Sequence, residues 1–106
     1  MIPLYQTGNE EFTLYHGDTM ELISNIGKKV DMIFADPPYF LSKNISTCIN
    51  GTWKSFDKGE WDRVTSLENI NAFNKKWLSE CRNVLKEDGT IFVTGTYHNI
   101  FSVATC

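Results

Sequence analysis

The sequence predicts an α/β fold in which a mostly parallel sheet of three strands has helices between its strands. Two continuous apolar runs, residues 30–35 and 90–94, are typical of strands that are covered on both faces. Between them, apolar side chains recur at helical spacing from Leu67 to Leu85. Strand and helix therefore alternate along the chain, which is the pattern of parallel strands joined by helical crossovers.

The first third of the chain adds a strand and a helix to this pattern. Residues 12–16 alternate weakly between apolar and polar side chains and predict a short strand. In residues 19–26 the apolar side chains recur at helical spacing. Asp18 is well placed as the N-cap of this helix and Gly27 as its C-terminal stop.

The remaining segments connect or end these elements. Residues 41–65 lack periodicity and collect polar residues, so we expect a long loop, of the kind that is usually functional or disordered. We expect residues 86–89 to close the helix that begins at Leu67, and Gly95 to end the strand after it. The last residues, 102–106, carry no helix terminator, so we expect the chain to stop within an element.

Composition and charge exclude several classes of protein. The 106 residues form one domain or part of one, and 42% hydrophobic with 22% charged residues is ordinary for a globular chain. No apolar run approaches the roughly 20 residues that span a bilayer, and the N-terminus lacks a signal pattern, so we expect a cytoplasmic protein. The net charge of −3 is unlike that of a stand-alone nucleic-acid binder. Any grip on phosphates must therefore lie mostly elsewhere.

The cysteines indicate neither a disulfide framework nor a zinc site. Cys48, Cys81 and Cys106 are odd in number and widely spaced. We expect ordinary reduced thiols and no bound metal.

Three polar segments are predicted to meet at one edge of the sheet. They are residues 16–18, 36–39 and 95–98, and each follows a predicted strand. Ligands of parallel α/β sheets bind beyond the carboxyl ends of the strands. This edge is therefore where a functional site is expected.

The segment Asp36-Pro37-Pro38-Tyr39 has two interpretations. One is a strand-terminating turn with a solvated Asp36 and a packing Tyr39. The other is a cluster of acceptors, because each proline restricts the residue before it and lacks an N–H. The Asp36 carboxylate and the Pro37 carbonyl would then accept from a planar ring that bears an amino group, with Tyr39 stacked on the ring.

A resemblance to a known family favours the second interpretation. The sequence "DPPY" after an apolar strand resembles the catalytic motif of amino-directed DNA methyltransferases, which methylate adenine N6 or cytosine N4 with S-adenosylmethionine. The segments "LYHGD" and "FNKKWLSECRNVLKEDGTIFVTGTYHNI" are similar to those that adjoin the motif in this family. "DPPYFLS", "DKGEWD" and "HNI" are similar to its DpnA-like branch, found in bacterial restriction–modification systems.

The resemblance implies a role for each residue of the motif. Asp36 and the Pro37 carbonyl would bind the target amino group, Pro38 would keep the turn rigid, and Tyr39 would stack on a base flipped out of DNA. Asp18 would bind the adenine amino group of S-adenosylmethionine, and Asp36 would also border the cofactor. The implied reaction is site-specific adenine-N6 methylation of DNA in the bacterial cytoplasm.

The resemblance also implies that parts of the enzyme lie outside the chain. The family's Phe-x-Gly-x-Gly cofactor loop and its target-recognition region have no counterpart in residues 1–106. We therefore expect the N-terminal, catalytic half of a methyltransferase domain with a partial Rossmann-like sheet. We expect it to need the other half as a partner and to bind S-adenosylmethionine weakly or not at all in a calorimetric titration.

Other residues carry weaker signals. Trp53 and Trp61 belong either to an ordinary surface loop or to a flap over DNA on which bases stack. Phe73 and Trp77 lie at helical spacing and are expected in the core. We expect His98 to be structural, because direct transfer to an amine needs no nucleophile. His16 carries no specific signal.

Alternatives remain open at this point. Cytosine-N4 methylation uses the same chemistry, but Ser more often stands at the position of Asp36. Cytosine-C5 methylation is disfavoured, because it needs a cysteine nucleophile and the sequence has no Pro-Cys pair. Methylation of RNA or of a protein amide is possible, although amide enzymes usually have Asn in the first position. A non-catalytic, truncated remnant is an alternative of a different class.

Overall fold

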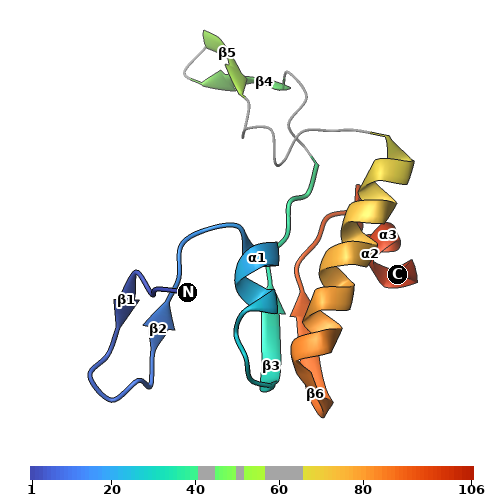
Figure 1. The fold of residues 1–106 in the computed structure, drawn as a ribbon. Coiled ribbons are helices and arrows are strands. Elements are labelled where there is room, and N and C mark those ends of the chain that lie inside the picture. Colours follow the sequence, from blue (N-terminus) through green and yellow to red (C-terminus); the bar gives the residue numbers. More distant parts are fainter. Residues whose placement is uncertain (41–44, 50–51, 57–65) are drawn as a thin grey trace.

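The described part of the chain forms three small two-stranded sheets and three helices, shown in Figure 1. The computed structural model describes residues 1–40, 45–49, 52–56 and 66–106. The elements are β1 Tyr5–Gln6, β2 Thr13–Leu14, α1 Thr19–Ser24, β3 Val30–Ala35, β4 Ile45–Ile49, β5 Thr52–Phe56, α2 Leu67–Val84, β6 Leu85–Val93 and α3 Ile100–Thr105. Within these ranges, no helix is both long enough and apolar enough to cross a membrane.

Strands β3 and β6 pair in parallel, which confirms the predicted βαβ arrangement at the centre of the molecule. Phe34 lies opposite Phe92, and Ala35 lies opposite Val93. The two strands therefore end side by side at one edge, where the polar segments that follow them begin.

Helix α2 begins at a capped residue and buries one stripe. The Ser66 hydroxyl accepts a hydrogen bond from the Asn69 N–H at 3.2 Å, which satisfies one of the open donors of the first turn. The buried residues recur every three or four positions and are Ile70, Asn74, Trp77 and Cys81. Trp77 is 7% exposed, so its predicted core position is confirmed, whereas Phe73 is only half-buried.

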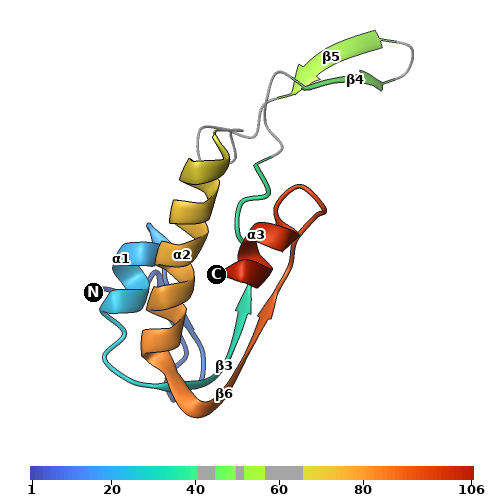
Figure 2. The same cartoon turned by 90° about the vertical axis from the view of Figure 1, so that its right-hand side faces the viewer.

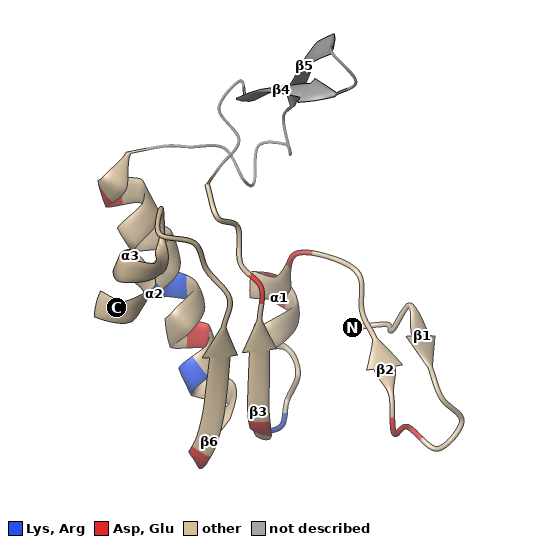
Figure 3. Cartoon of the chain, turned by 180° about the vertical axis from the view of Figure 1, so that it is seen from behind, with Lys and Arg blue, Asp and Glu red and all other residues tan. Residues whose placement is uncertain are grey.

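The sheet is covered on one face. Helices α1 and α2 lie on the same side of β3 and β6 in Figure 2, and in Figure 3, seen from behind, the strands lie in front of both. On the open side Met32, Phe34 and Phe92 are 58%, 67% and 54% exposed. The prediction that these strands are covered on both faces is therefore wrong for this chain, since the one crossover helix packs against a single face.

The N-terminal strand exists but does not join the parallel sheet. Strand β2 pairs antiparallel with β1, with Tyr5 opposite Leu14. The predicted three-stranded parallel sheet is therefore wrong in the described chain, because the ladder hydrogen bonds of β2 are made locally with β1. Asp18 is the N-cap of α1, as predicted, and the helix ends at Ser24, shortly before Gly27 with its positive φ of 73°.

The long segment after the motif contains two strands. Strands β4 and β5 pair antiparallel, so the prediction of a loop throughout residues 41–65 is wrong at these positions. Between them the sequence has Asn50-Gly51, a pair typical of tight hairpin turns. This pair is the sequence signal that could have predicted the hairpin. Residues 41–44, 50–51 and 57–65, which include Trp61, lie outside the described residues, as do the side chains of β4 and β5, which include Trp53.

The predicted helix closure at residues 86–89 is wrong, because these residues belong to β6. The helix ends at Val84, and Leu85 is already extended, with a ψ of 141°. The register then shifts, so that Val30 pairs with Leu85 but Met32 pairs with Thr90. Glycine suits position 89 in this irregularity, since a Cβ there would lie only 3.0 Å from the Lys86 carbonyl oxygen and 3.2 Å from that of Asp31.

The last residues form α3, a helix that the sequence did not predict. It is fixed to α2 by polar contacts. The Asn74 amide, fully buried, donates to Ser102 Oγ at 2.9 Å and accepts from Trp77 Nε1 at 3.0 Å. Ser102 Oγ in turn donates to Asn71 Oδ1. These bonds set the place of α3 beside the end of β6.

Candidate active site

The segments that leave β3 and β6 are brought together, as the sequence predicted. The ladder continues one step past β6, where the Thr94 N–H donates to the Ala35 carbonyl at 3.0 Å. Asp36 and Thr94, which are 58 positions apart in the chain, therefore begin the two neighbouring segments. Of the three predicted segments, the structure joins residues 36–39 with residues 94–99.

Three oxygen atoms form a compact cluster at this edge. The Tyr39 hydroxyl lies 2.6 Å from Asp36 Oδ1 and 2.7 Å from Thr94 Oγ1. Thr94 Oγ1 lies 2.5 Å from the same Asp36 oxygen. The two hydroxyls hold two protons, and both can point at the carboxylate. One carboxylate oxygen of Asp36 thus accepts from two donors that come from different segments.

The cluster has a defined protonation state at Tyr39. The hydrogen bond to Asp36 raises the pKa of the Tyr39 hydroxyl above its ordinary range, because the negative acceptor stabilises the protonated phenol. Tyr39 therefore stays a neutral donor at any pH near 7. An ionised carboxylate offers about four acceptor positions, more than the two that these hydroxyls use.

The prolines of the motif are held by a side chain from beyond β6. The Asn99 amide Nδ2 donates to the Pro38 carbonyl at 2.9 Å, across 61 positions of sequence. Asn99 is 1% exposed. Sequence reasoning assigned no role to Thr94 or to Asn99. Asn99 lies in the "HNI" segment that resembles the DpnA-like branch, but nothing in that segment indicates a contact with Pro38.

Phe40 anchors the end of the motif in a strained conformation. Its φ is +58°, which is rare for a bulky side chain. The side chain is 8% exposed, and its ring packs edge-on against Phe73, with centroids 5.6 Å apart and planes at 88°. Strain of this kind clusters at functional sites, where surrounding contacts hold it in place. The sequence carried no signal for it.

The other predicted site residues are placed separately. Asp18 is exposed and accepts from the Met20 N–H at 2.8 Å, so its carboxylate caps α1. Helix α1 starts at the end of the molecule where β3 finishes (Figure 1). His16 and His98 are both exposed, and the His98 ring lies 4.0 Å from that of Tyr97.

The charges at this edge are acidic. The described segments 36–40 and 94–99 contain Asp36 but neither Lys nor Arg. Elsewhere acidic and basic positions are mixed, as along α2 in Figure 3. Within the described ranges, no group of three or more His, Cys, Asp or Glu is arranged to hold a metal ion.

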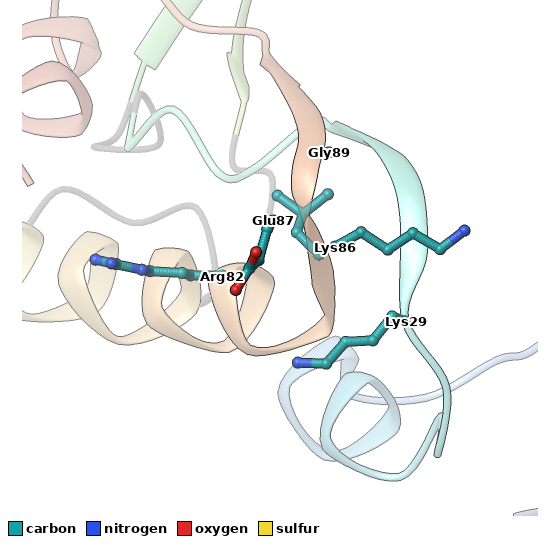
Figure 4. Close-up of a pocket in the computed structure, with 6 residues that line it drawn as sticks. Lys29, Arg82, Lys86, Glu87 and Gly89 are labelled. Atoms are coloured by element: carbon teal, nitrogen blue, oxygen red, sulfur yellow. The ribbon is translucent and has the colours of Figure 1, made fainter.

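A cavity of about 450 Å³ lies at the opposite end of the sheet and is separate from this cluster. It is lined by Lys29, Arg82, Leu85, Lys86, Glu87 and Gly89. Its cationic groups do not converge: in Figure 4 Arg82 and Lys86 extend in opposite directions. Lys86 pairs with Asp31 at 2.7 Å, and Lys29 donates to the Asn83 carbonyl at the end of α2. These bonds use both lysines in structural roles.

Comparison with known families shows which family the chain belongs to. Residues 30–106, from the first residue of β3 onward, match the family model for N6/N4 DNA methylases. The chain belongs to the N6/N4 DNA methylase family. The match contains the whole of the motif, α2, β6 and α3, whereas the hairpin β1–β2 and Asp18 precede it.

Individual relatives extend the similarity to nearly the whole chain. The type II methyltransferase M2.MboI from Moraxella bovis is 41% identical over 102 residues, which are 95% of this chain and 37% of the relative. M2.LlaDCHI from Lactococcus lactis subsp. cremoris is 45% identical over 102 residues, with the same coverage. M2.DpnII from Streptococcus pneumoniae is 45% identical over 91 residues, 85% of this chain and 34% of the relative. The chain therefore spans little more than a third of the length of each of these three relatives.

Proposed function

We propose that the chain is the catalytic part of a DNA methyltransferase that transfers a methyl group from S-adenosylmethionine to adenine N6. The observation that carries this proposal is the Asp36 carboxylate, held by Tyr39 and Thr94 at the carboxyl edge of a parallel sheet. Membership of the DNA methylase family and the type II methyltransferase relatives support it. Residues 1–106 would supply the acceptors for the target base.

The proposed role of the motif is to make a weak nucleophile stronger. The lone pair of an adenine amino group is delocalised into the ring. The Asp36 carboxylate and the Pro37 carbonyl would each accept one amino hydrogen, which favours a tetrahedral nitrogen with a localised lone pair. The nitrogen then forms its bond to the methyl carbon while the sulfur–methyl bond breaks. One amino proton leaves to water, and S-adenosylhomocysteine is the other product.

The expected contribution of Asp36 is moderate. A hydrogen bond to a charged group contributes about 1.5–3 kcal/mol, which corresponds to roughly 10–100-fold in rate. Alignment of the sulfonium with the amine contributes more, up to about 7–11 kcal/mol. The fixed geometry of residues 36–39 therefore matters at least as much as the charge of Asp36.

The remaining roles follow from the positions of the side chains. Tyr39 would stack on the flipped base, and the bonds of its hydroxyl to Asp36 and Thr94 set the orientation of its ring. Asp18 is an exposed carboxylate, chemically suited to accept a hydrogen bond from the adenine amino group of S-adenosylmethionine. S-adenosylmethionine would supply the activated methyl group, and Asp36 would border it as well.

Other parts of the enzyme would complete the site. The relatives are much longer than the matched segment, and the described edge lacks basic residues. We therefore place the glycine-rich cofactor loop, most phosphate contacts and target recognition outside residues 1–106, which would complete the Rossmann-like sheet. DNA is the proposed partner, and the bacterial cytoplasm is the proposed location.

The test compares two aspartates at opposite ends of β3. The chain is assayed alone and joined to the remainder of the Moraxella bovis relative, in place of the matched segment. Methyl transfer from labelled S-adenosylmethionine to DNA is measured, and the modified nucleosides are separated. In the joined protein we expect N6-methyladenine as the product. We also expect kcat of its Asp36→Ala variant to fall at least roughly 10-fold.

The matched control is Asp31→Ala. Asp31 is an exposed aspartate at the other end of the strand, and among the described residues it pairs with Lys86 at the surface. We expect its kcat to stay within about twofold of the parent, because exposed ion pairs contribute little. Full activity of Asp36→Ala would refute the catalytic assignment, and N4-methylcytosine as the product would refute the choice of base.

A further inference from the structure

We propose that Thr94 and Asn99 are positioning residues for the transfer reaction, acting through Asp36 and Pro38 respectively. This inference rests on the proposed function, since it concerns the orientation of Asp36 and of the turn that carries the acceptors for the target amino group. It assigns a role in the reaction to the segment between β6 and α3, which carries no part of the motif itself.

The motif needs donors from outside because two of its own are missing. Pro37 and Pro38 have no N–H, so neither can tie the turn to its surroundings through a backbone donor. At Pro37 and Pro38 the backbone can therefore be held only through carbonyls that accept from donors elsewhere. Thr94 and Asn99 supply one donor each.

Thr94 is held rigidly enough to orient Asp36. Its N–H donates to the Ala35 carbonyl at 3.0 Å, so its backbone continues the parallel ladder. From this position its Oγ1 lies 2.5 Å from Asp36 Oδ1 and 2.7 Å from the Tyr39 hydroxyl. A threonine hydroxyl on a β-branched side chain has few rotamers, so the direction of its bond is well defined. The carboxylate is thereby turned to one orientation.

Asn99 is used in a way that stability alone does not explain. It occupies the N-cap of α3, yet its side chain makes no capping bond. Its Nδ2 donates to the Pro38 carbonyl instead, and its Oδ1 is buried without a hydrogen-bond partner among the described residues. An asparagine at this position would normally cap the helix, and a buried unpaired carbonyl is unfavourable. Asn99 thus holds Pro38 at the cost of a helix cap and of a hydrogen bond to its own Oδ1.

The approach of Asn99 to the motif is built into the fold. The start of α3 lies against Gly95, where a Cβ would be 3.5 Å from Ile100 Cβ and 3.7 Å from Asn99 Oδ1, both ordinary contact distances. Ser102 fixes α3 to the buried Asn74 of α2 at 2.9 Å. Helix α2, α3 and β6 therefore act as one support for the motif.

The experiment uses the active protein defined above and separates positioning from folding. The variants are Thr94→Val, which removes the hydroxyl at constant shape, Thr94→Ser, which restores it, and Asn99→Asp, which replaces the donor by an acceptor. Thr105→Val is the matched control, because its hydroxyl donates to the Phe101 and Ser102 carbonyls of its own helix. Each is measured for kcat and for the KM of DNA and of S-adenosylmethionine, with circular dichroism as a check of folding.

We expect kcat to fall roughly 10-fold in Thr94→Val and in Asn99→Asp, with both KM values within about twofold of the parent. Thr94→Ser should recover most of the activity, and Thr105→Val should be unchanged. In single-turnover measurements on Asp36→Asn, adding Thr94→Val should cause little further loss, since residues that act through one another are not additive.

Several results would overturn the inference. One such result is a kcat that is unchanged in both Thr94→Val and Asn99→Asp. Another is a double variant, Asp36→Asn with Thr94→Val, in which the two losses multiply. A third is a Thr94→Ser variant that is as slow as Thr94→Val. If Thr94→Val fails to fold, Thr94→Ser and Asn99→Asp decide the question. A parent protein without transfer to DNA would refute the proposed function, and this inference with it, whereas an active parent with unaffected variants refutes the inference alone.

Discussion

The backbone of Phe40 leads to a prediction that reverses the usual order of two substitutions. Phe40 follows the motif directly, is 8% exposed and has a φ of +58°. Its ring packs against Phe73 at a centroid distance of 5.6 Å. Both Phe40→Ala and Phe40→Gly lose this packing, but only glycine adopts the positive φ without strain.

The magnitudes are set by three effects. Loss of a buried phenylalanine ring costs about 3–5 kcal/mol in either variant. Alanine keeps a left-handed backbone cost of roughly 1–2 kcal/mol. Glycine removes that cost but makes the unfolded chain more flexible, which costs about 0.4–1 kcal/mol. We therefore expect Phe40→Gly to be the more stable variant, by about 1 kcal/mol.

The assay is urea unfolding followed by circular dichroism, with the same pair of substitutions at Phe73 as the control. Phe73 lies inside α2, where glycine is less favourable than alanine by about 0.8–1 kcal/mol. The order should therefore reverse between the two members of one aromatic pair. A Phe40→Ala variant at least as stable as Phe40→Gly would show that the backbone at Phe40 is not left-handed.

Two further predictions concern titrating groups. The pKa of Tyr39 is raised, chiefly by its hydrogen bond to Asp36, so difference spectra against Tyr39→Phe should show ionisation above the ordinary range. Because the folded pKa exceeds the unfolded one, this contribution to stability is complete below the unfolded pKa and is lost as pH rises through the folded pKa; ionisation at the ordinary value would contradict the bond. Burial raises the pKa of the Cys81 thiol, so in a Cys48→Ser chain a thiol reagent should modify the exposed Cys106 first and Cys81 only slowly. Equal rates for the two thiols would show that Cys81 is not shielded.

Local patterns in the sequence determined the elements that bring the motif to its edge. Continuous apolar runs predicted β3 and the end of β6, and helical spacing predicted α2 and the burial of Trp77. Their order then predicted parallel pairing, and therefore that Asp36 would lie beside the segment after β6. These predictions succeeded because each depends on a period or a cap that neighbouring residues define.

Predictions failed where distant pairing or geometry overrode a local pattern. The strand predicted at residues 12–16 pairs antiparallel with β1 and is therefore not part of the parallel sheet. Residues 86–89 resemble a helix stop but belong to β6, at the point where its register with β3 shifts. At Gly89 the carbonyl oxygens of Lys86 and Asp31 come close to the backbone. The apolar run at residues 30–35 indicated cover on both faces, but such a run does not tell how many helices pack against it, and Met32 and Phe34 lie on an open face.

The sequence by itself identified the motif, but only the tertiary structure determined which residues contact it. Four letters and their flanking strand indicated the acceptors at Asp36 and Pro37. The contacts of Thr94 with Asp36 and of Asn99 with Pro38 join residues 58 and 61 positions apart. Such contacts depend on the parallel register of β3 with β6 and on the docking of α3 against α2. No local pattern encodes them, because hydrogen-bond partners are chosen by distance in space and not by spacing along the chain.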